Sequence, residues 1–119
     1  MFLRLAHTRL DIFIVSRNLV SAIYRSIKSF PSDERYALTQ QIRRAVVSVH
    51  LNVAEGCSRK SSSERRRFLE IARGSLIEVD TALSLAVELE YISTECLREE
   101  EELINRCFQM LSKMIDLST

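Results

Sequence analysis

Residues that break helices are scarce in this chain, which holds two glycines and one proline among 119 residues. Tight β-turns rely on these residue types, so a fold of many short strands joined by such turns is disfavoured. A chain of this length forms one domain and buries roughly two-thirds of the surface that it exposes when unfolded. Long helices in a single domain, residues 1–119, are therefore expected.

Residues that bind metals are few as well. Histidine and cysteine are represented by His7, His50, Cys57, Cys96 and Cys107, none of them at the spacing of metal ligands. An odd number of cysteines fits a reducing compartment, where buried thiols act as small apolar groups. We therefore expect a cytoplasmic protein with no metal, no cofactor and no small-molecule substrate.

Long hydrophobic runs are also missing. Residues 45–54 form the longest uncharged stretch near the middle of the chain, and they are too few to cross a bilayer. Arg9, Asp11 and Arg17 interrupt the apolar N-terminal stretch, so no signal peptide is expected. The sequence gives no reason to expect a membrane partner.

Charge is balanced overall but unevenly distributed. The formal net charge is +1, yet residues 1–73 carry 14 basic and 6 acidic side chains, whereas residues 74–119 carry 3 basic and 10 acidic ones. The basic part can attract polyanions, and the acidic part opposes them. The two parts can also attract each other, within one chain or between subunits.

Hydrophobic periodicity predicts four helices. They cover about residues 8–28, 33–55, 62–90 and 94–116. Because the connections are short, successive helices run antiparallel, and the expected fold class is an all-α, up-down-up-down four-helix bundle. The expected inward residues outside the second helix are Phe13, Val20, Ile23, Ile27, Phe68, Ala72, Leu76, Val79, Leu83, Ala86, Val87, Leu97, Ile104, Cys107, Phe108, Leu111 and Ile115.

Capping residues support these boundaries. Ser32 is a suitable N-cap for the second helix, and Gly56 is a suitable left-handed residue at its end. Residues 61–64, Ser-Ser-Ser-Glu, match a capping box that opens the third helix. Ser93 or Thr94 caps the fourth helix.

The second helix has two apolar faces, whereas an ordinary surface helix has one. Its main apolar face holds Ile42, Ala45, Val46, Val49 and Val53. A polar stripe lies beside this face and holds Gln41, Arg44, Ser48, Asn52 and Glu55. A second apolar strip holds Val47, Leu51 and Ala54. This pattern predicts a helix that is covered from two directions, by its own bundle and by another subunit.

Two features point to polar or close contacts between the middle helices. Glu55 lies where the helix dipole disfavours an anion, so we expect it to be partly buried and paired with Arg59 or Arg73. Gly74 lies inside a helix at a cost of about 1 kcal/mol, which indicates either a close contact with a helix or subunit, or a tolerated defect. The expected subunit interface or structural polar network consists of Arg44, Val47, Ser48, Leu51, Asn52, Glu55, Arg73, Gly74, Ser75 and Glu78.

Basic side chains cluster at the turn between the second and third helices. They are Arg59, Lys60, Arg65, Arg66 and Arg67. A phosphate backbone is the polyanion that such a cluster suits, and recognition would depend on charge and shape because no aromatic residue lies within the cluster. The alternative is a solvated surface whose charges pair with nearby carboxylates. The four carboxylates of residues 99–102 are likewise expected to be a solvated face.

The middle of the chain resembles a known family. The matching residues include Gln41-Ile42-Arg43-Arg44-Ala45, Ser48-Val49, Asn52-Val53-Ala54-Glu55-Gly56 and Arg59, with Phe30-Pro31, Tyr36 and Leu38 upstream and Phe68-Leu69, Ile71 to Leu76, Glu78 and Thr81 downstream. They resemble the signature of the bacterial four-helix-bundle proteins encoded within intervening sequences of 23S ribosomal RNA genes. That family is similar in fold to the accessory variability determinant of diversity-generating retroelements. The resemblance implies a barrel-like homopentamer and a role in handling RNA beside a reverse transcriptase, without catalytic activity.

Three functional hypotheses follow. The first is a non-enzymatic homo-oligomeric scaffold that binds RNA through the basic cluster, as an accessory protein of a reverse transcriptase. The second is a protein-only adaptor, in which the basic and acidic parts bind partners or sister subunits. The third is an enzyme that uses Glu55, Glu78 and Ser48, but no nucleophile–base pair or metal spacing supports it.

Overall fold

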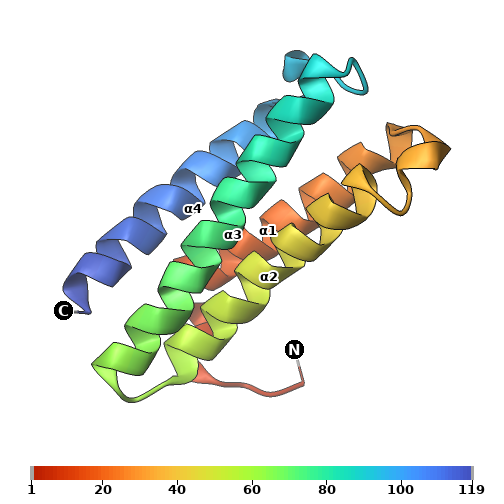
Figure 1. Cartoon of the computed structure of the whole chain (residues 1–119). Helices are drawn as coiled ribbons and strands as arrows, with labels where there is room; N and C mark the ends of the chain where they lie inside the picture. Colours follow the sequence, from red (N-terminus) through yellow and green to blue (C-terminus); the bar gives the residue numbers. More distant parts are fainter. Residues whose placement is uncertain (1, 119) are drawn as a thin grey trace.

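The computed structural model describes residues 2–118 and contains four α-helices. They are α1 (Asp11–Ser26), α2 (Leu38–Ser58), α3 (Ser62–Glu88) and α4 (Arg98–Leu117) (Figure 1). Short 3-10 helices cover Ala6–Arg9, Ile27–Ser29, Ser32–Glu34 and Thr94–Leu97. No strand occurs within residues 2–118, so the expected all-α fold is confirmed.

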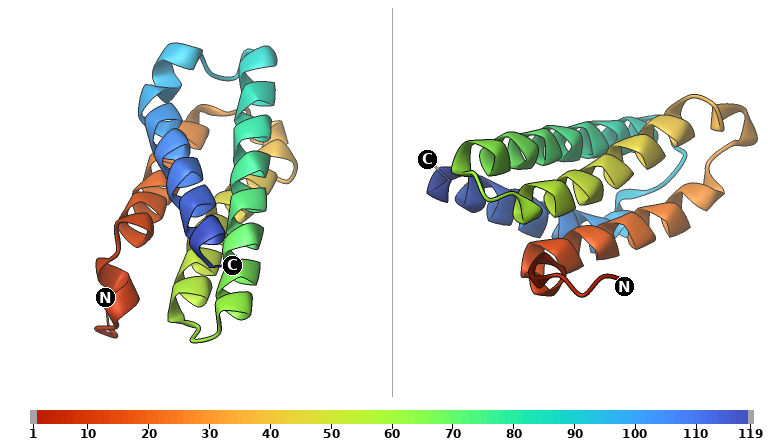
Figure 2. Two further views of the ribbon diagram at one scale, coloured as in Figure 1. Left: turned by 90° about the vertical axis from the view of Figure 1, so that its left-hand side faces the viewer. Right: turned by 90° about the horizontal axis from the view of Figure 1, so that it is seen from below.

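Each helix packs against two others, in the cyclic order α1, α2, α3, α4 and back to α1. The resulting bundle measures 43 × 30 × 24 Å. Figure 2 shows that the α2–α3 connection lies at one end of the bundle and the α3–α4 connection at the other. None of the helices between residues 2 and 118 is long and apolar enough to span a membrane.

One hydrophobic cluster fills the space between the four helices. Its fully buried members include Leu19, Ile23, Ile42, Val46, Val49, Val53, Leu69, Leu76, Val79, Cys107, Leu111 and Ile115. In α2 all five residues of the main apolar face predicted from periodicity are buried, and Thr39 and Gly56 are buried with them. Phe108 was expected in this core but is 41% exposed, because α4 turns Leu103 and Cys107 inward instead.

The start of α3 follows the predicted capping pattern. The Ser61 side chain accepts a hydrogen bond from the backbone N–H of Glu64 at 3.4 Å. The Ser93 hydroxyl likewise accepts from the N–H of Cys96 at 3.3 Å, and a 3-10 turn there precedes α4.

Both predicted boundaries of the second helix were wrong. Residues 32–34 form a separate 3-10 turn, and α2 begins only at Leu38. At the other end α2 continues through Gly56 to Ser58, and no glycine within residues 2–118 has a positive φ. A Cβ atom on Gly56 would lie 3.2 Å from side-chain atoms of Leu69 and Phe68. Glycine is therefore used here for a close approach of α2 to α3, and not for a left-handed helix end.

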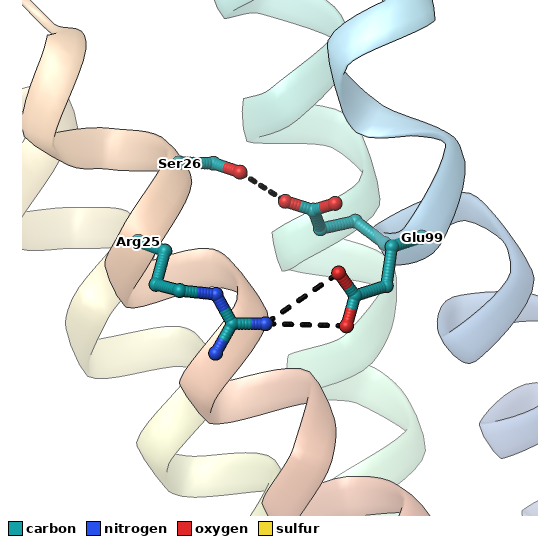
Figure 3. Close-up of polar contacts among 4 residues, drawn as sticks. Arg25, Ser26 and Glu99 are labelled. Atoms are coloured by element: carbon teal, nitrogen blue, oxygen red, sulfur yellow. Dashed lines mark hydrogen bonds and ion pairs between the residues drawn. The ribbon is translucent and has the colours of Figure 1, made fainter.

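Carboxylates of α4 join it to α1 (Figure 3). The Arg25 guanidinium lies 3.2 Å from the Glu99 carboxylate, and both side chains are exposed. Next to this pair, the Ser26 hydroxyl donates a hydrogen bond to Glu100, which is only 2% exposed. The expected solvated acidic face is thus wrong for Glu100, because its position on α4 places it on the side that packs against α1.

Candidate interaction face of helices α2 and α3

The polar stripe of α2 faces α3 and forms a ladder of hydrogen bonds with it. The Gln41 amide donates to the Glu78 carboxylate. About two helical turns further along α2, the Ser48 and Ser75 hydroxyl oxygens lie 2.9 Å apart. Asn52 Nδ2 donates back to the Ser48 carbonyl at 2.9 Å and to its hydroxyl at 3.1 Å. Partly buried polar groups along this seam are therefore paired, as burial requires.

Glu55 pairs with one of the two expected arginines. Arg59 Nη2 lies 2.8 Å from Glu55 Oε2, and the guanidinium also lies 5.1 Å from the centre of the Phe68 ring. Both charged side chains are about half exposed, so Glu55 is paired as expected and lies near the surface. Arg73 lies on the other side of α3, where it donates to the Ser112 hydroxyl of α4 at 3.2 Å.

An exposed apolar strip runs beside the polar ladder. Leu51 of α2 is 57% exposed, with Val47 and Ala54 partly exposed next to it. The neighbouring exposed apolar residues of α3 are Ile71, Leu85 and Leu89. At 100° per residue these three side chains share the side of α3 that carries Ser75 and Glu78. Exposed apolar side chains thus occur on this side of both helices, and such side chains suit a binding face.

Gly74 does not contact another helix of its own chain. A Cβ atom placed on it would meet no atom within 4 Å, and the residue is exposed. The prediction of a close helix crossing within the bundle was therefore wrong, and contact with another subunit stays a prediction. Arg44, a member of the polar stripe, is exposed as well.

The basic cluster lies at the end of the bundle where α2 turns into α3. Part of its charge is used within the chain. Arg59 pairs with Glu55, and Arg66 Nε lies 2.6 Å from Glu70 Oε1. Arg65 donates to the Arg59 carbonyl at 2.9 Å and so braces the turn. The other two members, Lys60 and Arg67, are exposed and have no hydrogen bond or ion pair within residues 2–118.

A family model that describes the 23S rRNA-intervening sequence protein matches residues 8–113. The chain belongs to this family. A solved structure of a protein of unknown function, from the S23 ribosomal protein family of Bacteroides thetaiotaomicron VPI-5482, is 21% identical to the chain. The match covers 87% of this chain and 97% of that one with a TM-score of 0.79, which shows a shared fold. No curated protein matches the chain.

Within residues 2–118 the chain has no cluster of three or more His, Cys, Asp or Glu side chains that could hold a metal ion. The residues of the enzyme hypothesis do not form a catalytic arrangement. Ser48 contacts Ser75 and Asn52, and neither of these can act as a general base. Glu78 is engaged by Gln41 on the same ladder.

The chain also has a half-buried imidazole, which belongs to His50 of α2. His50 lies on the α1 side, with its ring centre 4.6 Å from that of Phe13. Its Nδ1 is 2.8 Å from the Ser16 hydroxyl. Burial lowers the pKa of His50 from its ordinary value of 6.5, and the nearby Arg17 charge lowers it further. The helical position of His50 could have indicated this burial. His50 lies four residues after Val46 and three residues before Val53, beside the core face of α2.

Proposed function

We propose that this chain is a non-enzymatic scaffold that assembles into a ring of identical subunits through α2 and α3 and binds RNA through its basic cluster. The observation that carries the proposal is the exposed apolar strip of α2 and α3, centred on Leu51. It lies on the face where the polar groups are already paired with each other, so a second copy can cover it without leaving buried polar groups unsatisfied.

Self-assembly explains three features of this face together. Leu51 and the apolar residues of α3 are covered, Gly74 allows a close approach of a neighbouring backbone, and the exposed Arg44 pairs with acidic groups. A repeated use of one face against a different face closes into a ring. The number five comes from the resemblance to the family and its retroelement relatives.

RNA binding rests on Lys60 and Arg67. Their charges are not compensated within residues 2–118, and they are exposed at the end of the bundle where the α2–α3 turn projects. Two free cations per subunit bind a polyanion weakly, but a ring repeats them and multiplies the affinity. Such a ring would serve as an accessory protein of the reverse transcriptase of a diversity-generating retroelement.

A titration of a structured RNA with the assembled protein tests this binding. Fluorescence anisotropy at low salt should show binding, and the affinity should fall steeply as the salt concentration rises, because counterions are released from the phosphates. Lys60→Gln combined with Arg67→Gln should abolish most of the binding. Arg98→Gln combined with Lys113→Gln removes the same charge from exposed sites on α4 and should bind almost as the wild type does. No binding at low salt, or equal loss in both double variants, rejects RNA binding.

The alternative is a protein-only adaptor without a direct role in RNA handling. It is favoured by the fact that Arg59 and Arg66 already pair with Glu55 and Glu70. In that case, neutralising Arg65, Arg66 and Arg67 should change the mass of the assembly or the capture of a partner, and RNA should have no effect. Light scattering of the triple variant, with and without RNA, separates the two functions.

A further inference from the structure

A second basic site lies away from the α2–α3 turn, in a hollow where the chain passes from α1 to α2. The hollow has a volume of about 240 Å³. Its apolar wall is formed by Ile27, Phe30 and Pro31. Its polar lining consists of Lys28, Ser32, Arg35, Thr39 and Arg43, so three cations and two hydroxyls surround one small space.

The three cations are not neutralised by the chain. No carboxylate lines the hollow, and Lys28, Arg35 and Arg43 have no hydrogen bond or ion pair within residues 2–118. Arg35 has a single recorded contact, in which its guanidinium lies 5.9 Å from the centre of the Tyr36 ring. Arg43 is partly buried, which makes the absence of a counter-ion more costly for it than for a solvated side chain.

The carboxylates next to the hollow in sequence are directed elsewhere. Glu34 accepts a hydrogen bond of 2.6 Å from the Tyr91 hydroxyl, which belongs to the connection between α3 and α4. That hydrogen bond raises the pKa of Tyr91, and the charges of Glu34 and Asp33 contribute to the same shift. Both carboxylates therefore act on Tyr91, and neither lines the hollow.

A buried hydroxyl without a partner also lines the hollow. Thr39 is 7% exposed, and its Oγ1 is the one buried side-chain nitrogen or oxygen atom within residues 2–118 that makes no hydrogen bond. Such orphaned groups are rare in folded proteins, because each costs about 1–3 kcal/mol. Thr39 is also in the first turn of α2, where the helix dipole favours an anion.

We propose that this hollow binds a phosphate group. Lys28, Arg35 and Arg43 supply the positive charge, and the Thr39 hydroxyl, which is buried beneath the lining, donates a hydrogen bond to a phosphate oxygen once its side chain rotates toward the hollow. The hollow is smaller than the roughly 300–1,000 Å³ of sites that enclose a whole small-molecule ligand, so it suits a phosphate group rather than a complete nucleotide. The site goes beyond the proposed RNA-binding function, and it can exist even if the basic cluster binds no RNA.

The hollow lies far from the basic cluster of the α2–α3 turn. The hollow lies at the N-terminal end of α2 and the cluster at the C-terminal end, separated by the 21 residues of that helix, or about 30 Å. The two sites are thus at opposite ends of the bundle, as the connections in Figure 1 show. Variants in one site should not disturb the other directly, which makes the two functions separable by experiment.

Titration with inorganic phosphate, followed by calorimetry at constant ionic strength set with chloride, tests the site. The wild type should bind one phosphate per subunit. Thr39→Val should fold with equal or greater stability in phosphate-free buffer, because it removes an unsatisfied hydroxyl, yet bind phosphate about tenfold more weakly. Arg35→Gln with Arg43→Gln should lose binding. Arg98→Gln with Lys113→Gln removes the same charge from exposed sites on α4, is the matched control and should bind phosphate as the wild type does.

The outcomes separate this site from the proposed function. Absence of phosphate binding by the wild type, or unchanged affinity in both Thr39→Val and the Arg35/Arg43 variant, overturns the site. If saturating phosphate displaces bound RNA from the wild type but not from the Arg35→Gln/Arg43→Gln variant, the natural ligand is a phosphate of RNA. If RNA stays bound, or never binds, while phosphate occupies the hollow, the ligand is free phosphate or a small phosphate ester. Both of these results support the site.

Discussion

The hydroxyl of Ser16 lies 2.8 Å from Nδ1 of His50, in the packed seam between α1 and α2. Burial of the imidazole, with a smaller effect of Arg17, lowers its pKa in the folded protein below the value of 6.5 that it has when unfolded. The unfolded chain therefore takes up a proton first as the pH falls. We expect the free energy of unfolding to be constant above about pH 6.5 with respect to this residue and to decrease as the pH drops below it.

His50→Gln is the variant that isolates this effect, because glutamine can keep a hydrogen bond to Ser16 but does not titrate. Urea unfolding of both proteins across the pH range 5–8 should show a smaller loss of stability in the variant below about pH 6.5. His7 remains in both proteins, so any difference belongs to His50. Identical pH profiles would show that the imidazole is not held neutral by the fold.

Two neighbouring residues of α1 should differ in their effect on stability. Ser26→Ala leaves the buried Glu100 carboxylate without its hydrogen-bond donor and should lower the free energy of unfolding by about 1–3 kcal/mol. Arg25→Ala removes only the exposed pair with Glu99 and should cost about 0–1 kcal/mol. Denaturant unfolding measures both. A larger effect of Arg25→Ala would mean that Glu100 is not the residue that fixes α4 against α1.

The two glycines should respond to alanine with opposite signs. Gly74→Ala places a methyl group in open space within a helix, so it should raise stability by up to about 1 kcal/mol. Gly56→Ala forces Leu69 and Phe68 to move, and overpacking of this kind should lower stability by about 1–2 kcal/mol after the gain in helix propensity. Both are best measured in a variant that does not self-assemble, so that subunit contacts do not contribute.

The three cysteines should react with a thiol reagent in a fixed order. Cys96 is exposed and should be modified first. Burial raises the pKa of Cys57, and it raises that of Cys107 to about 12, so that hardly any thiolate of Cys107 exists at neutral pH. Intact-mass spectrometry during alkylation should show one fast addition, one slow addition and a third only after unfolding. Early modification of Cys107 would contradict the tight packing of α4.

Helix number, order and core faces were predictable, because they depend on periodicity that is written locally in the sequence. The start of α2 was not predictable in this way. Residues 32–34 carry a good capping pattern, yet they form a separate turn in which Glu34 binds Tyr91, a residue 57 positions away along the chain. Such a tertiary contact leaves no local signal, and it overrides capping preference.

The polar contacts were predictable only in part. The polar stripe of α2 could be recognised in the sequence. Its pairing with Ser75 and Glu78 could not, because it depends on the rotation of α3 about its own axis. The burial of Glu100 had a readable signal, since it precedes Leu103, Cys107 and Leu111 at helical spacing. The basic hollow combines residues of the connection between α1 and α2 with residues of α2 itself, so no single sequence motif predicted it.

The mass of the particle in dilute solution, measured by size-exclusion chromatography with light scattering, tests self-assembly through α2 and α3 most directly. We expect the wild type at several times the mass of one chain, and Leu51→Glu at the mass of one folded chain. Ile77→Glu is the matched control, because Ile77 is 51% exposed on α3 but lies outside the apolar strip, and it should leave the assembly intact. A wild type that elutes as a single copy, or an assembly that Leu51→Glu leaves unchanged, would contradict the account.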